Sequence, residues 1–325
     1  MRHRALAALL VTLLAAVWRH QAQATQPDFL AYLQGEAPAL VAFNPTGFNP
    51  NIPRAELWPA DAIAADLAAL RPAFDGLVLY DTRPEVTPIV VETAATAGFK
   101  AVLLGVWDPL SDPELALAAS LIRRWQDRLA FAIVLGNEGI NDNRYRIEDL
   151  AIARDRLRAQ LGPQHQRVPV TTSEPAGDYG WPPLLAFGDF LTPNIHPALD
   201  RAGLPPETAV DWVRARARAI TAAAGRPVLI KETGMPHGGA PKFTPERQRL
   251  FWSAWLARPR FEPVAPPAGD HTAFLSSAAA FEAFDTPWKA EWLHSPIEGS
   301  WGLMTIERRP YPAFQTWAEA RPPAR

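Results

Sequence analysis

The stretch Phe131-Ala-Ile-Val-Leu-Gly-Asn-Glu138 begins with five consecutive apolar residues and ends on a carboxylate. A continuous apolar run of this length is typical of a strand covered on both faces, whereas a half-exposed strand alternates apolar and polar residues. Similar short segments recur on both sides of it, each followed by a turn and mostly by a helical pattern. The expected strands are Ala39–Asn44, Gly76–Thr82, Ala101–Trp107, Phe131–Glu138, Val168–Glu174, Phe190–His196, Val228–Glu232 and Ala280–Asp285.

Helix start and stop signals occupy the intervals between these strands. Ser111-Asp-Pro-Glu114 has the pattern of a capping box, and glycines end two long helical patterns. The expected helices are 115–125, 145–161 ending at Gly162, 207–224 ending at Gly225, and one opened by Thr244 that runs to Trp255. Eight strands alternating with helices predict an α/β fold, a single (β/α)8 TIM barrel. The Pro-rich stretch Pro259–Gly269 is interpreted as a loop insertion, because a domain boundary there would leave the barrel unclosed.

The first 24 residues predict a secretory signal peptide. Arg2 and Arg4 precede the apolar run Ala5–Val17, and Ala22-Gln-Ala24 has the small-x-small pattern of a cleavage site. A retained membrane anchor is the alternative, but the run falls short of the roughly 20 residues that span a bilayer. We therefore expect residues 25–325 to form one catalytic domain, secreted or periplasmic, with no stable membrane insertion after signal removal.

Composition excludes several classes of function. The formal net charge of −2 becomes −5 without the signal segment, which contains three arginines and no acid, and this balance argues against nucleic acid as a partner. With no cysteine, disulfides and thiolate chemistry are absent. A metal-dependent hydrolase is a weaker alternative, because the seven histidines include no pair spaced i, i+4; we expect neither metal nor cofactor. Twelve tryptophans suit either a core or a groove in which rings stack on sugars.

Two glutamates lie at the carboxyl ends of expected strands. The active sites of TIM barrels lie at the carboxyl ends of the strands. Glu138 ends the fourth expected strand, and Glu232 ends the seventh. Cleavage of a glycoside with retention of configuration requires two carboxyl groups about 5–5.5 Å apart, one as nucleophile and one as acid/base. Asn137, directly before the first glutamate, is placed to hydrogen-bond a hydroxyl near the reacting carbon.

Three motifs in chain order carry a resemblance to a known family. They are Gly136-Asn-Glu138, Lys231-Glu-Thr-Gly-Met-Pro236 and Phe281-Glu-Ala-Phe-Asp-Thr-Pro-Trp-Lys289, joined by Val102–Trp107, Glu298–Met304 and Pro310-Tyr-Pro312. Together they resemble glycoside hydrolase family 17, in particular its bacterial β-1,3-glucanase and β-1,3-glucanosyltransferase branch, over nearly the whole mature chain. The resemblance implies that Glu138 is the acid/base and Glu232 the nucleophile.

The resemblance also implies a set of substrate-binding residues. Glu282 and Lys289 are expected in a charged cluster near the nucleophile, with an ordinary rim salt bridge as the alternative. Tyr80 matches a family position that holds an aromatic hydroxyl near the site. Three tryptophans are candidates for stacking on sugars, with a core position as the alternative: Trp107, Trp288 and Trp301.

Four departures from the family pattern touch substrate contacts. Thr286 replaces the usual Glu, His196 replaces the usual Tyr, and Met235 replaces the usual Trp. The run Gly139–Arg144 differs from the usual loop. His196 is expected to donate to the nucleophile or to a sugar hydroxyl. No departure removes a catalytic carboxylate.

The leading hypothesis is a retaining enzyme acting on β-1,3-glucan, by hydrolysis, transglycosylation or both. It would act as a monomer on an oligo- or polysaccharide. The competing hypothesis is a non-catalytic carbohydrate-binding protein on a glycoside hydrolase scaffold. Retention of both carboxylates discriminates between the two and favours the enzyme.

Overall fold

Five parallel strands form the continuous part of the sheet in the computed structural model, which describes residues 27–165, 167–264 and 273–322. They pair in chain order, β1 with β2 through to β4 with β5. Their bounds are Leu40–Ala42 (β1), Gly76–Val78 (β2), Ala101–Val106 (β3), Ala130–Asn137 (β4) and Val170–Ser173 (β5). Each agrees with an expected strand. The expected signal peptide, residues 1–24, lies outside the described residues.

Isolated parallel bridges continue the sheet into a closed ring. They join Pro175 to Asn194, Leu191 to Val228, Asn194 to Glu232, Val228 to Leu275, Thr233 to Ala280, and Val41 to Ala280. The last bridge returns to β1, where the amide of Ala42 donates to the carbonyl of Ala280 at 2.9 Å. Pro193 and Pro227 lack an N–H, so the ladder around them is broken into single bridges. The expected (β/α)8 barrel is confirmed.

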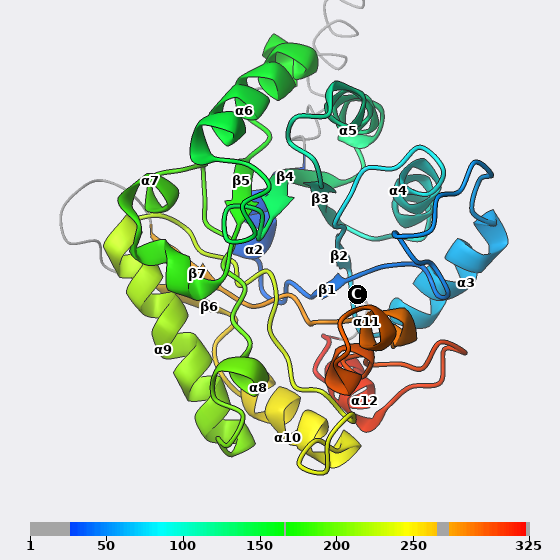
Figure 1. Cartoon of the computed structure of the whole chain (residues 1–325), viewed down its shortest axis with the longest axis vertical. Helices are drawn as coiled ribbons and strands as arrows, with labels where there is room; N and C mark the ends of the chain where they lie inside the picture. Colours follow the sequence, from blue (N-terminus) through cyan, green and yellow to red (C-terminus); the bar gives the residue numbers. More distant parts are fainter. Residues whose placement is uncertain (1–26, 166, 265–272, 323–325) are drawn as a thin grey trace, which may run out of the picture.

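Helices surround this ring, as Figure 1 shows. The longer ones are α3 (Ala60–Leu70), α4 (Thr87–Thr96), α5 (Asp112–Trp125), α6 (Ile147–Leu161), α9 (Pro206–Ala224), α10 (Pro245–Leu256) and α12 (Pro312–Glu319). The shorter ones are α2 (Phe29–Leu33), α7 (Pro182–Leu185), α8 (Pro197–Asp200), α11 (Pro287–Trp292), and the 3-10 turns η1 (Pro163–His165), η2 (Ala176–Gly180) and η3 (Pro296–Gly299). Gly162 and Gly225 cap α6 and α9 as expected, each with positive φ.

The eighth strand begins earlier than the expected Ala280–Asp285. Leu275, inside β7 (Phe274–Ser276), already pairs with Val228. The expected loop insertion contains a strand as well, because β6 (Phe261–Pro263) pairs antiparallel with β7. Serines and alanines follow β7, so the sequence has no long apolar run that would mark the start of this strand. The start is defined by long-range pairing instead.

The expected capping box at the start of α5 is only half formed. Ser111 accepts a hydrogen bond from the amide of Glu114, as the pattern requires. The Glu114 carboxylate, however, accepts from the amides of Thr82, Trp107 and Asp108 at 2.9, 2.7 and 3.0 Å. Three amides of neighbouring rim segments bind the carboxylate better than the single N-cap amide would.

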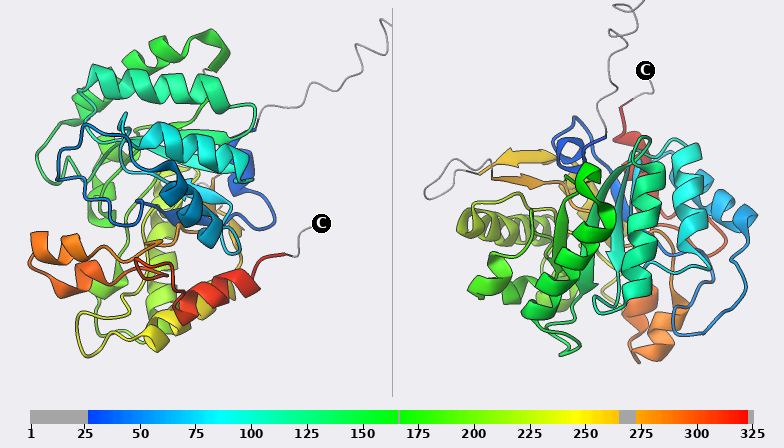
Figure 2. Two further views of the ribbon diagram at one scale, coloured as in Figure 1. Left: turned by 90° about the vertical axis from the view of Figure 1, so that its right-hand side faces the viewer. Right: turned by 90° about the horizontal axis from the view of Figure 1, so that it is seen from above.

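The two ends of the barrel have different roles. Figure 2 shows α2, β6 and β7 at one end and α11 at the other. A hollow of about 930 Å³ lies at the amino ends of the strands, lined by Asp75 and Lys100 among others. The buried Asp75 binds Tyr32 Oη at 2.7 Å, Arg321 at 3.0 Å and Lys100 at 3.1 Å. We interpret this end as structural, because the active sites of TIM barrels lie at the carboxyl ends of the strands.

Candidate active site

The backbone at Glu138 has a conformation that residues other than glycine rarely adopt. Its φ is +53°, in the left-handed region, which costs of order 1 kcal/mol or more for a residue other than glycine. The amide of Glu138 donates to the carbonyl of Ser173 at 2.7 Å and holds the residue against β5. Two residues earlier, a Cβ on Gly136 would lie 1.9 Å from Tyr145 Oη, so only glycine fits under that ring. The segment Gly136-Asn-Glu138 is therefore shaped to turn the glutamate out of the strand.

One asparagine fixes the carboxyl group of Glu138. Asn194 Nδ2 donates to Glu138 Oε1 at 2.8 Å and to Asn137 Oδ1 at 3.1 Å. The Asn194 amide is itself oriented by Ser173, whose Oγ donates to Oδ1 at 3.0 Å. Burial raises the pKa of Glu138, and the negative charge of Glu232 raises it further, against the opposing bond from Asn194. This carboxyl group is thus biased toward its protonated form.

The environment of Glu232 has the opposite effect. Its side chain is buried, and its Oε1 accepts a hydrogen bond from Lys231 Nζ. His196 Nε2 lies 3.3 Å from the other oxygen, Oε2. Burial alone would raise the pKa of Glu232, but the charge of Lys231 and the contacts from His196 outweigh it and hold the pKa well below its usual range. This carboxylate stays ionised.

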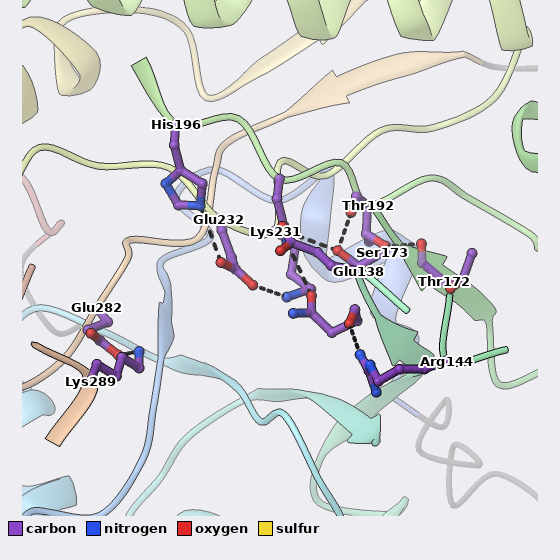
Figure 3. A network of polar contacts seen from close by, with 12 residues as sticks. Glu138, Arg144, Thr172, Ser173, Thr192, His196, Lys231, Glu232, Glu282 and Lys289 are labelled. Carbon is purple, nitrogen blue, oxygen red and sulfur yellow. Dashed lines mark hydrogen bonds and ion pairs between the residues drawn. The ribbon is translucent and has the colours of Figure 1, made fainter. Parts of the chain in front are cut away.

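A single strand segment connects the two carboxyl groups. Asn194 binds Glu138 through its side chain and pairs with Glu232 through its backbone, and His196 follows two residues later. Figure 3 shows the resulting network, in which both glutamates face the same space. Two neighbouring carboxyl groups whose pKa values are driven apart can act as a proton donor and an anion in one reaction. The expected pair therefore meets in the fold.

Tyr80 lies beside this pair. Its ring is 4.5 Å from Lys231 Nζ, a cation–π contact. Burial and the nearby charges of Glu232, Glu282 and Glu138 raise the pKa of its hydroxyl well above the usual value. Tyr80 therefore lies among the carboxylates of the candidate site, and its contact with substrate stays a prediction.

The charged cluster on the strand-eight motif is buried. Glu282 Oε2 accepts from Lys289 Nζ at 2.7 Å, and Glu282 Oε1 accepts from Thr286 Oγ1 at 2.9 Å. Burial raises the pKa of Glu282, although Lys289 and Thr286 oppose it. Figure 3 shows the Glu282–Lys289 pair set apart from Glu232. Since Glu282 is only 2 % exposed, the pair differs from an ordinary solvent-exposed rim salt bridge.

The three candidate stacking tryptophans have different surroundings. Trp107 is 42 % exposed, and the guanidinium of Arg144 lies 4.1 Å from its ring. Trp288 is half-buried. Trp301 is 0 % exposed and packs edge-on against His196 and Phe281, so the stacking prediction for Trp301 is wrong. A completely enclosed ring offers no face to a sugar; it supports the imidazole of His196 instead.

Two departures from the family pattern gain a structural meaning. Of the two alternatives for His196, donation to a sugar or contact with the nucleophile, the described geometry has the contact with Glu232. Met235 is 1 % exposed and belongs to the core rather than to a cleft surface. The sequence reasoning missed Asn194 and assigned no role to Lys231. Both stand at strand ends, and applying the strand-end rule to every polar residue there would have found them.

Replacing Asn194 by leucine removes the hydrogen bond to Glu138 with little change in volume. We expect the pKa of Glu138 to rise further, because a bond to the charged form is lost. The measurement is a pH titration followed by NMR of carboxyl-labelled glutamate, with the Glu138→Gln variant to assign the signal. Asn51→Leu, the same change at an exposed loop position, serves as control. An unchanged Glu138 titration in Asn194→Leu would contradict the assignment.

Within residues 27–165, 167–264 and 273–322, no cluster of three or more His, Asp or Glu is arranged to hold a metal ion. Within the same ranges, no helix has both the length and the apolar character to cross a bilayer.

Comparisons with known proteins identify the family and agree with the fold. The model of the BtgE/BtgC glycoside hydrolase domain matches residues 47–302. The protein named "Putative glucan endo-1,3-beta-glucosidase btgC" of Aspergillus niger is 25% identical over 290 residues, which cover 78% of this chain. The match covers 40% of that relative's length.

Solved structures share the barrel at low sequence identity. A family 17 β-1,3-glucanosyltransferase of Rhizomucor miehei has a TM-score of 0.65 at 17% identity, covering 85% of this chain and 96% of that one. A β-1,3-glucanase and pollen allergen of Cryptomeria japonica, CJP38, has a TM-score of 0.59 at 13% identity, covering 85% and 98%. At such identities the likeness shows the fold. The family model, which matches most of the chain, carries the assignment: this chain belongs to the BtgE/BtgC glycoside hydrolases, within glycoside hydrolase family 17.

Proposed function

We propose that this chain is a retaining glycoside hydrolase that acts on β-1,3-glucan, with Glu138 as acid/base and Glu232 as nucleophile. The observation that carries the proposal is the opposite bias of the two pKa values, raised at Glu138 and lowered at Glu232. A retaining mechanism needs this asymmetry, because one carboxyl group must deliver a proton while the other attacks as an anion. Family membership supplies the reaction class independently.

The proposed reaction has two steps. In the first, a Glu232 oxygen bonds to the anomeric carbon while Glu138 gives its proton to the departing glycosidic oxygen. In the second, the Glu138 carboxylate takes a proton from water or from a sugar hydroxyl, whose oxygen displaces Glu232 from the anomeric carbon. Lys231 and His196 stabilise Glu232 as an anion, which makes it a good leaving group in this second step.

The substrate assignment rests on relatives. The Aspergillus niger relative is named as a glucan endo-1,3-beta-glucosidase, and the Rhizomucor miehei transferase has been crystallised as an active-site mutant with laminaritriose. We extend this substrate class to the present chain. Asn137, Tyr80, Trp107 and Trp288 are proposed to contact the sugar, with Lys289 and Glu282 as a supporting charged pair. The alternative of a non-catalytic binding protein is less favoured, because such a protein has no need for two carboxyl groups of opposed pKa.

Digestion of laminaripentaose tests the function directly. The first-formed reducing end, followed by ¹H NMR, is expected to be the β-anomer, because two inversions at one carbon restore its configuration. Cellopentaose, with the same sugar in β-1,4 linkage, is the control and is expected to remain uncleaved. An initial α-anomer would exclude a retaining mechanism. No cleavage of either sugar would exclude the proposed substrate.

The same digestion separates hydrolysis from transglycosylation. Both share the covalent intermediate and differ in whether water or a sugar intercepts it. Products longer than the pentaose identify transfer, and products that are only shorter identify hydrolysis.

We propose that residues 1–24 direct export and are removed, so that residues 25–325 act as one catalytic domain outside the cytoplasm. The chain is proposed to act as a monomer on its glucan. Amino-terminal sequencing of the exported protein and its mass in solution test these two points.

A further inference from the structure

A second buried carboxylate lies close to Glu138 and has no role in the proposed reaction. Glu174 directly follows β5 and is 0 % exposed. Its Oε1 accepts the amide of Ile140 at 3.0 Å, and its Oε2 accepts the amide of Asn141 at 3.2 Å. Both amides belong to the turn that follows Glu138. The side chain of Glu174 therefore binds the backbone two and three residues after the proposed acid/base.

This carboxylate is costly to bury. Among the ion pairs of the described residues, none includes Glu174. Burial raises its pKa to about 7 against the opposing hydrogen bonds from the two amides, and the charges of Asp178 and Glu138 raise it further. A buried carboxylate without a cation destabilises the fold unless hydrogen bonds compensate for its lost hydration. The hydrogen bonds that Glu174 accepts both come from amides of the turn after Glu138, so we expect its role there.

The turn needs an external grip because Glu138 is strained. At φ +53° its backbone returns to an extended conformation unless the surroundings hold it. Ser173 holds the residue by accepting its amide at 2.7 Å. Glu174 holds the amides of Ile140 and Asn141, two and three residues further along the chain. Tyr145 Oη completes the anchoring by accepting the amide of Gly139 at 3.0 Å.

Glu174 also supports the side-chain carboxyl group of Glu138, through Asn194. Its main-chain carbonyl accepts the amide of Asn194 at 3.0 Å, and the Asn194 side chain binds Glu138 Oε1. A single residue thus connects through its side chain to the turn after Glu138, at Ile140 and Asn141, and through Asn194 to the carboxyl group of Glu138. Substituting the side chain alone leaves the second connection intact, which makes the first one separately testable.

We propose that Glu174 is a positioning residue for the acid/base: its bidentate carboxylate fixes the turn after Glu138 and so aims the Glu138 carboxyl group at the glycosidic oxygen. The inference rests on the proposed role of Glu138. It predicts a loss confined to proton transfer, because within the described residues the side chain of Glu174 binds the turn after Glu138, whereas the Glu232 carboxylate is held by Lys231 and His196.

The test compares two substrates that differ in their need for a proton. In Glu174→Gln, one amide of the turn loses its acceptor, because the Gln NH₂ faces an N–H. We expect kcat/KM for laminaripentaose to fall about 10²-fold, the loss typical of a misplaced catalytic group. For the 2,4-dinitrophenyl glycoside of laminaribiose, whose leaving group departs without a proton, kcat/KM is expected to stay within about threefold. The ratio kcat/KM reports the first step only, so the later need for a base does not interfere.

Two variants control the comparison. Glu138→Gln must show the same split between the substrates. Glu114→Gln removes a carboxylate that grips a different rim segment through three amides, and we expect it to change both substrates equally. Glu174→Asp retains the charge with a shorter reach and is expected to recover part of the lost kcat/KM, which also provides a readout if the Gln variant folds poorly.

The outcomes separate the two claims. If Glu138→Gln lowers kcat/KM for both substrates alike, the acid/base assignment fails and the inference fails with it. If Glu138→Gln shows the split but Glu174→Gln loses both activities equally, or neither, then Glu174 is only structural and the inference alone is overturned.

Discussion

Glu232→Gln is expected to lower kcat on laminari-oligosaccharides by at least about 10³-fold, which corresponds to about 4 kcal/mol in the activation free energy. The amide is nearly isosteric with the carboxylate and retains one acceptor oxygen, enough for Lys231 or His196 but not for both, and it does not form the glycosyl–enzyme bond. Substrate affinity is expected to persist, because binding depends on other side chains. Calorimetric titration of the variant with laminaritriose measures that affinity.

Azide provides the diagnostic measurement for the nucleophile. In Glu232→Gly, the removed side chain leaves room for azide to attack the anomeric carbon from the face that Glu232 occupied. With an activated aryl β-glycoside as substrate, the expected product is the α-glycosyl azide, formed by one inversion. Glu246→Gln, on the exposed face of α10, is the matched control and is expected to retain the wild-type rate. Wild-type turnover by Glu232→Gln would overturn the assignment.

Glu138→Gln is expected to lower kcat/KM for laminari-oligosaccharides by about 10²–10⁴-fold, the contribution typical of a general acid. A sugar leaving group needs the proton that the raised pKa of Glu138 retains. In the wild-type enzyme, activity should fall as the pH rises through that raised pKa, because the acid is then lost. The variant is expected to lack this basic limb, and a pH profile of kcat/KM measures both effects.

The stereochemistry of azide trapping distinguishes this variant from the previous one. Glu138→Gln still forms the glycosyl–enzyme intermediate from an activated substrate but has no base to activate water. Azide needs no base, so it should accelerate turnover and give the β-glycosyl azide by two inversions. An α-product from Glu138→Gln would exchange the roles assigned to the two glutamates.

The sequence predicted the barrel well where strands are continuous and apolar. The run through β4 is apolar from Phe131 to Leu135, and such a pattern is local. The eighth strand was harder. Its start at β7 is set by pairing with Val228, which lies far away along the chain, and with β6, which lies beyond a loop. The full capping box at α5 failed for a related reason, because the Glu114 side chain found distant amides that no local pattern reports.

The candidate site divides in the same way. Glu138 and Glu232 are recognisable because a glutamate at the carboxyl end of a barrel strand is a local feature. For Trp301 the motif leaves sugar stacking and a core position open, and the structure has it inside the core against His196. Exposure depends on what packs over a residue, which a motif does not contain.

By itself, then, the sequence determined the order of strands and helices and the two carboxyl groups that the barrel brings to one rim. The tertiary structure alone decided which of them stays protonated. Asn194 and burial act on Glu138, while Lys231 and His196 act on Glu232, and Glu174 holds the turn between β4 and α6. Charge, burial and hydrogen bonding act through space over a few ångströms, so the pKa of a carboxyl group is a property of neighbours that only folding assembles.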